Sequence, residues 1–161
     1  MSLLIIDQSI KYEREDAFKD KIVLKIKEPQ NRFIYLVGIQ RQEKVPRESP
    51  SNTLEGIARQ VARLKSCTKK ITEIANLGHD LVVAGDMNID WLLPNDLLLR
   101  PELRALYPVL DDFLLYSSIT QLNTRPTRHQ IGHNSSLLNL FLANIPNRIT
   151  NVDKLSPARF G

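Results

Sequence analysis

The chain has 161 residues, of which 42% are hydrophobic and 25% are charged. This length allows one domain with a sizeable core, and this balance excludes a chain that is disordered throughout. The formal net charge of +4 favours a polyanionic partner, although a basic surface that only keeps the protein soluble explains the charge equally well.

Cysteine content and the start of the chain bear on the compartment. Cys67 is the single cysteine, which excludes an intramolecular disulfide and a zinc site built on several thiolates. We therefore expect an intracellular protein. Residues 1–7 contain only four consecutive apolar residues and no basic flank, so we predict a strand there rather than a signal peptide or a membrane span.

The first predicted elements form a hairpin. Residues 21–27 alternate between apolar and mainly basic side chains, which is typical of a half-buried strand. Residues 32–39 are almost continuously apolar and are predicted to lie inside a sheet. The turn Glu28–Asn31 joins the two strands in an antiparallel hairpin, and the polar residues 40–50 form a surface loop.

A long amphipathic helix follows. Asn52 is the predicted N-cap, because Glu55 stands three residues later and can complete a capping box. Gly78 fits the left-handed position after the helix. The predicted core positions recur at three- and four-residue steps and include Ile57, Val61, Leu64, Cys67, Ile71, Ile74 and Leu77.

The stretch Leu81–Asp90 is the predicted centre of the molecule. Four apolar residues precede Gly85, and Asp86 and Asn88 follow it. This pattern predicts a buried strand with polar side chains of a site at its end. A carboxylate and an amide aimed together suit a hydrated divalent cation beside a phosphate. The alternative is an Asx turn that only ends the strand.

The second half predicts one helix and two short strands. The helix begins near Pro101 and ends near residues 116–118, and residues 119–122 form a short strand. A polar loop, 123–136, leads to a central strand over 137–142 that contains Asn139 at a functional or hydrogen-bonded position. The order strand, strand, helix, strand predicts an α/β or α+β fold.

Basic charge is concentrated in the last quarter. From Gln121 onward, five lysines and arginines stand against one aspartate, which gives a local net charge of +4. Such a surface favours salt-dependent contacts with phosphates. The basic residues are Arg125, Arg128, Arg148, Lys154 and Arg159.

Three motifs stand in a recognisable order. They are Gly-Asp-Met-Asn at 85–88, Pro-Thr-Arg at 126–128 and Ser-Leu-Leu-Asn-Leu-Phe at 136–141. Residues 20–161 thereby resemble the endonuclease/exonuclease/phosphatase family, in the form of the endonuclease domain that accompanies reverse transcriptase in non-LTR retrotransposons. The resemblance implies a four-layered α/β sandwich of two mixed sheets flanked by helices that cuts DNA with Mg²⁺. A retroelement origin further implies that the protein acts in the nucleus.

The resemblance also assigns residues. It implies that Asp86 is the catalytic aspartate and a Mg²⁺ ligand, and that Asn88 steadies the scissile phosphate. Thr127 and Arg128 are expected to bind nucleic acid, together with Arg125 directly before the motif. These roles agree with their chemistry, because carboxylates orient water and amide and guanidinium groups stabilise charge on phosphoryl oxygens.

The chain departs from the family pattern at several positions. Asn139 occupies the place of a second catalytic aspartate, and an amide supplies no negative charge. Residues 40–42 read Gln-Arg-Gln where the family has Tyr-Arg-Pro, and an upstream glutamate and a downstream Ser-Asp-His have no counterpart. We therefore expect residues 1–161 to form a single, partial domain, truncated or degenerate. The alternative is a non-catalytic module that binds nucleic acid or serves as a subunit of an assembly.

The remaining predictions concern the edge of the sheet and single side chains. Missing N-terminal strands predict an exposed sheet edge and apolar face, and therefore poor solubility, dimerisation or a protein partner that covers the edge. His129 and His133 are more typical of a loop than of a metal site. We expect Trp91 to pack beneath the sheet rather than to stack on a base, and Asp111 and Asp112 to form a solvated pair rather than to bind a cation.

Overall fold

The computed structural model describes residues 9–15, 21–40, 50, 52–91, 100–126 and 137–149. The predicted N-terminal strand at 1–7 and most of the loop 40–50 lie outside these ranges. The elements are β1 (Tyr12–Glu15), β2 (Lys21–Lys27), η1 (Pro29–Asn31), β3 (Phe33–Gln40), α1 (Leu54–Asn76), β4 (Asp80–Asp86), α2 (Pro101–Ser117), β5 (Thr120–Gln121), β6 (Asn139–Ala143) and η2 (Pro146–Arg148).

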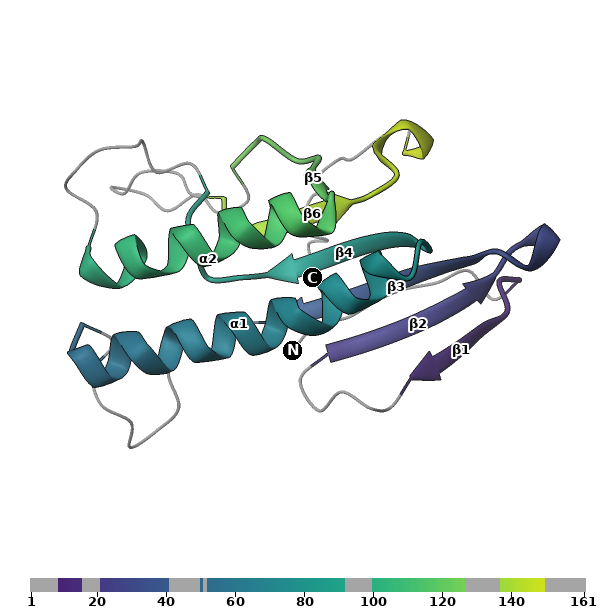
Figure 1. Cartoon of the computed structure of the whole chain (residues 1–161). Coiled ribbons are helices and arrows are strands. Elements are labelled where there is room, and N and C mark those ends of the chain that lie inside the picture. Colours follow the sequence, from purple (N-terminus) through teal and green to yellow (C-terminus); the bar gives the residue numbers. More distant parts are fainter. Residues whose placement is uncertain are drawn as a thin grey trace, which may run out of the picture.

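The strands form one mixed sheet in the order β1-β2-β3-β4-β6-β5 (Figure 1). The β2–β3 pair is antiparallel, which confirms the predicted hairpin, and α1 connects β3 to its parallel neighbour β4. β6 lies between β4 and β5, so the prediction of a central strand is also confirmed. The α/β class is confirmed. The described strands all belong to this one sheet, whereas the predicted sandwich has two.

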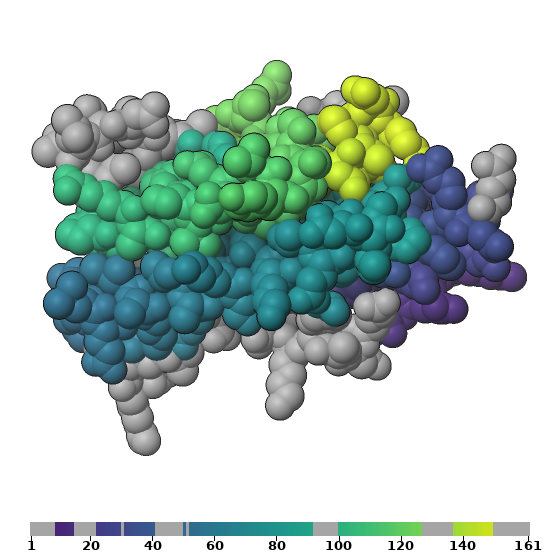
Figure 2. Space-filling model, viewed as in Figure 1, coloured from purple at the N-terminus to yellow at the C-terminus, as the bar shows by residue number. Residues whose placement is uncertain are grey.

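The two helices lie side by side on one face of the sheet (Figures 1 and 2). They run in the same direction, and the hydroxyl oxygens of Thr72 on α1 and Ser117 on α2 are 2.9 Å apart. The predicted start of α1 was wrong by one residue. Thr53 is the N-cap, because its Oγ1 accepts a hydrogen bond from Gly56 N at 3.1 Å.

The end of α1 corrects one predicted core position. Leu77 is the C-cap residue and 66% of its surface is exposed, so it lies outside the core. The helical pattern fails there because the chain leaves the helix at Leu77, and Gly78 takes the predicted left-handed conformation at a φ of 73°.

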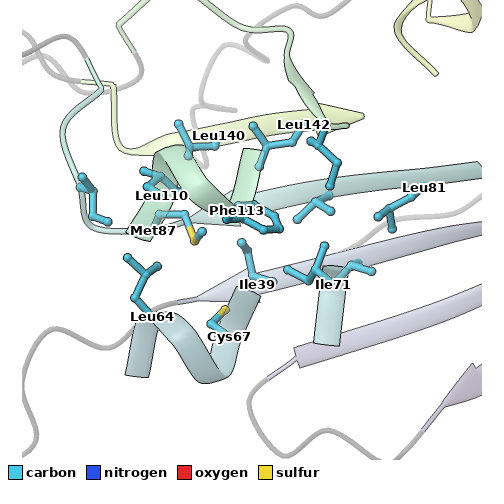
Figure 3. Close-up of a cluster of buried hydrophobic side chains, with 14 of the residues drawn as sticks. Ile39, Leu64, Cys67, Ile71, Leu81, Met87, Leu110, Phe113, Leu140 and Leu142 are labelled. Carbon is cyan, nitrogen blue, oxygen red and sulfur yellow. The ribbon is translucent and has the colours of Figure 1, made fainter. Parts of the chain in front are cut away.

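The core fills the space between the helices and the sheet (Figure 3). Val23, Val37, Val83 and Leu142 are register partners across four strands, and all of them are buried. Side chains alternate along each strand, so the neighbours of these residues project from the opposite face, which we call the far face. The helices contribute Leu64, Cys67, Ile71, Leu106, Leu110 and Phe113 to this core.

Candidate active site

Gly85 allows the end of β4 to lie unusually close to β3. Its φ is +151°, and a Cβ built on it would lie 1.8 Å from the carbonyl oxygen of Ile39 on β3. No other residue fits here unless the two strands move apart. Gly85 therefore allows the backbone of β4 to lie close to β3. This close contact fixes the position of the next residue, Asp86, which is the last residue of β4.

Asp86 and Asn88 form an Asx turn. Asn88 N donates a hydrogen bond to Asp86 Oδ1 at 2.7 Å, and Asn88 has a positive φ of 49°. Asn88 thus lies beyond the strand rather than on it. The Asx turn that the sequence analysis gave as the alternative is thus present in the structure. It is compatible with a functional site, because the side chains of Asp86 and Asn88 both remain partly exposed.

Three polar residues share one row across the far face. Gln40 is the register partner of Asp86 on one side, and Asn139 is its partner on the other. Met87 N donates to Leu138 O at 3.1 Å, which makes Asp86 and Asn139 a pair without mutual backbone hydrogen bonds. Side chains of such pairs are the closer ones, with Cα atoms about 4.5 Å apart. We call Gln40, Asp86 and Asn139 the site row.

A network of hydrogen bonds holds the turn after β4 against the start of β6. Leu137 N donates to Asp90 Oδ1 at 2.9 Å, and Trp91 N donates to Leu137 O at 3.0 Å. The Tyr107 hydroxyl on α2 donates to the carbonyl oxygen of Asp90. Burial, with the nearby carboxylates of Asp90 and Asp111, raises the pKa of Tyr107 to about 12, so this donor keeps its proton near neutral pH.

The charge of the site row comes from one carboxylate. Asn139 and Gln40 contribute neutral amides, and the described part of the chain contains no group of three or more His, Cys, Asp or Glu side chains able to hold a metal. Carboxylate and amide oxygens are the atoms that Mg²⁺ prefers, and Mg²⁺ commonly uses only one or two protein carboxylates plus substrate phosphates. The donor atoms of the site row therefore match Mg²⁺ in kind, and one carboxylate is within the number that Mg²⁺ commonly uses.

The predicted nucleic-acid-binding residues are described in part. Arg125 is exposed and follows β5 closely, whereas Thr127 and Arg128 lie outside the described residues. The link between this segment and the site row is Asn123, whose side chain bonds to the backbone of β6. The sequence analysis did not single out Asn123. The sequence signal that could have identified Asn123 is a polar residue close to the end of a very short strand.

The other sequence candidates are resolved as follows. Trp91 packs against the core, as predicted, and Cys67 is buried. Asp111 and Asp112 are exposed on α2, which agrees with a solvated pair. His129 and His133 lie outside the described residues. None of the described helices is long and apolar enough to cross a membrane.

Solved structures share this fold. The endonuclease domain of TRAS1, a telomere-specific non-LTR retrotransposon, superposes with a TM-score of 0.52 at 15% identity, over 86% of this chain and 57% of that chain. An AP endonuclease from Archaeoglobus fulgidus superposes with a TM-score of 0.50 at 16% identity, over 84% of this chain and 60% of that chain. The chain has the endonuclease/exonuclease/phosphatase fold.

The comparison has clear bounds. The chain spans less than two thirds of the length of either of these endonucleases. No protein-family model and no curated protein matches it by sequence. The endonuclease/exonuclease/phosphatase fold, predicted from three short motifs, is therefore confirmed by structure at low sequence identity.

Proposed function

We propose that this chain is an endonuclease-like domain that binds DNA at the site row and cleaves a phosphodiester bond with Mg²⁺. The observation that carries this proposal is the pairing of Asp86 and Asn139, whose side chains leave the same face of the sheet as close neighbours. The fold shared with two endonucleases supports the same assignment.

Each residue has a role in this proposal. The Asp86 carboxylate holds the cation or orients the attacking water, and the amides of Asn88 and Asn139 donate hydrogen bonds to phosphoryl oxygens. Bound Mg²⁺ supplies Lewis-acid polarisation of the phosphate. Arg125, Thr127 and Arg128 bind the flanking DNA backbone, which adds affinity without sequence preference.

The finer architecture belongs to the same proposal. Leu36, Val82 and Phe141 are apolar residues on the far face and keep partial exposure. A second sheet packed on that face would complete a four-layered sandwich and place the site row at the edge between two sheets. The 57% and 60% coverage of the related endonucleases supports the proposal that residues 1–161 form one partial domain.

The retrotransposon origin is also a proposal. It rests on the three motifs and on the shared fold with the TRAS1 endonuclease domain. A chain of this origin would act with a reverse transcriptase on chromosomal DNA, which places it in the nucleus.

A second function is favoured by one observation. The site row carries one carboxylate because Asn139 is an amide, and an amide neither takes a proton nor attracts a cation strongly. A domain with this row binds nucleic acid without cutting it, or serves as a structural subunit.

Plasmid nicking separates the two functions. The purified chain is incubated with supercoiled plasmid and Mg²⁺, with EDTA and the Asp86→Ala variant as controls. Nicking that requires Mg²⁺ and disappears in Asp86→Ala supports the endonuclease. Salt-dependent DNA binding without nicking supports the binding module, and the absence of both leaves the structural role.

A further inference from the structure

The chain leaves the sheet abruptly after β5. This strand has two residues, and Leu122 extends the pairing through one hydrogen bond, from its N to Phe141 O at 2.8 Å. The next residue continues the pairing with its side chain instead of its backbone. Phe141 N donates to Asn123 Oδ1 at 2.6 Å, and Asn123 Nδ2 donates to Asn139 O at 2.7 Å.

The two hydrogen bonds require a carboxamide. One side chain must accept from an N–H and donate to a carbonyl that lies two residues away on the same strand, as the backbone C=O and N–H of one residue in a parallel strand would. An aspartate would place a carboxylate oxygen against the Asn139 carbonyl. The backbone of Asn123 is itself held, because Gln121 Nε2 donates to its carbonyl oxygen at 2.7 Å. Asn123 is therefore fixed at both its side chain and its backbone.

This attachment determines where the following segment lies. Asn139, which receives the hydrogen bond from Asn123, also belongs to the site row with Asp86. Thr124 and Arg125 follow directly and are exposed. The segment thus starts at the outer edge of the strand that carries Asn139, on the side opposite to β4.

We infer that Asn123 is a positioning residue that holds Thr124–Pro126 beside the site row, so that Arg125 contacts a phosphate of the bound nucleic acid. This inference rests on the proposed DNA binding. Two hydrogen bonds suffice for the task, because they replace the backbone pairing that would otherwise keep the segment in the sheet. Without them the guanidinium is no longer held near the phosphate and its contribution to binding is lost.

A double-mutant cycle tests the inference. Wild type, Asn123→Ala, Arg125→Ala and the double variant are titrated with a short DNA duplex at several salt concentrations. We expect each single variant to bind several-fold more weakly and to lower the slope of log K against log salt by about 1, the loss of one phosphate contact. The double variant should bind no more weakly than either single variant, because Asn123 acts through Arg125.

The controls separate positioning from stability. Thr120→Ala, at an exposed position of β5 outside this segment, should leave affinity and salt slope unchanged. Asn123→Leu keeps nearly the shape of the side chain without adding a charge and removes both hydrogen bonds, so it should match Asn123→Ala and serves if the alanine variant does not fold. Additive effects of Asn123→Ala and Arg125→Ala, or an unchanged salt slope in both position-123 variants, would overturn the inference. Failure of the wild type to bind DNA would overturn the proposed function as well, which distinguishes the two failures.

Discussion

The two ends of β4 carry aspartates in contrasting environments. Asp80 begins the strand and is 5% exposed, and its carboxylate bonds to Arg32 Nη2 at 3.2 Å and to Arg148 Nη1. Asp86 ends the strand, is partly exposed and accepts a hydrogen bond from Asn88 N. Both residues project from the far face, because six positions separate them on an alternating strand.

The difference shows how one residue type serves structure at one end and is available for chemistry at the other. Two guanidinium groups compensate the charge of Asp80, and Arg148 also pairs with Glu28 at 2.5 Å, so the cluster joins η2 to the sheet. Within the described ranges no cationic side chain pairs with Asp86. The carboxylate of Asp86 is therefore available to a ligand in a way that the carboxylate of Asp80 is not.

The strongest test of this contrast is Asp86→Asn. The isosteric amide keeps an oxygen for the Asx turn but removes the charge, so we expect nicking to fall at least about 100-fold while stability changes little. Nicking rates and urea unfolding, measured side by side, report the two effects. Unchanged nicking would remove Asp86 from the reaction.

Asp80→Asn should show the opposite profile. The substitution weakens hydrogen bonds between a buried carboxylate and two arginines, so we expect the free energy of unfolding to fall by about 2 kcal/mol. DNA affinity at a temperature where the variant is folded should match wild type. A loss of affinity without a loss of stability would mean that this end of β4 also serves the site.

A smaller effect is expected from Asn139→Asp, which adds a second carboxylate to the site row. If charge limits metal binding, nicking should rise about tenfold at low Mg²⁺ concentration, equivalent to about 1.4 kcal/mol. The double variant Asp86→Asn with Asn139→Asp should stay inactive. An unchanged rate in Asn139→Asp would show that some other feature limits the reaction.

The smallest effect is the pH dependence of the arginine cluster. The hydrogen bond from Arg148, reinforced by the charges of Arg148 and Arg32, lowers the pKa of Glu28 below its ordinary value of 4.5. Its stabilising contribution is complete above pH 4.5 and disappears as the pH falls through the lowered pKa. Wild type should thus be slightly more stable than Glu28→Gln at neutral pH, and the difference measured by urea unfolding should vanish in acid.

The sequence predicted the parts that depend on local patterns. Alternation and apolar runs located β2, β3, β4 and β6, because one buried face imposes period-two patterning. Asp86 and Asn139 were found as polar residues within or after apolar strands. The site row was not predictable in this way, since the register that places Gln40 beside Asp86 depends on pairing across 46 positions of chain.

Other features carried no local signal. The hydrogen bonds of Asn123 and Asp90 join residues that are far apart in sequence, and each of these side chains looks like an ordinary loop residue. The sequence analysis did not single out Asp80, because its ion pairs are with Arg32, directly before β3, and with Arg148 in η2, both far away in sequence. β1 is short and exposed, so it lacks the alternating burial that reveals a strand.

The missing side chain at position 85 has a wider consequence. Because the backbone of Ile39 occupies the space that a Cβ would need, any larger residue would wedge two central strands apart. Folding alone therefore requires a glycine at this position, whether or not the residues that follow it carry out chemistry.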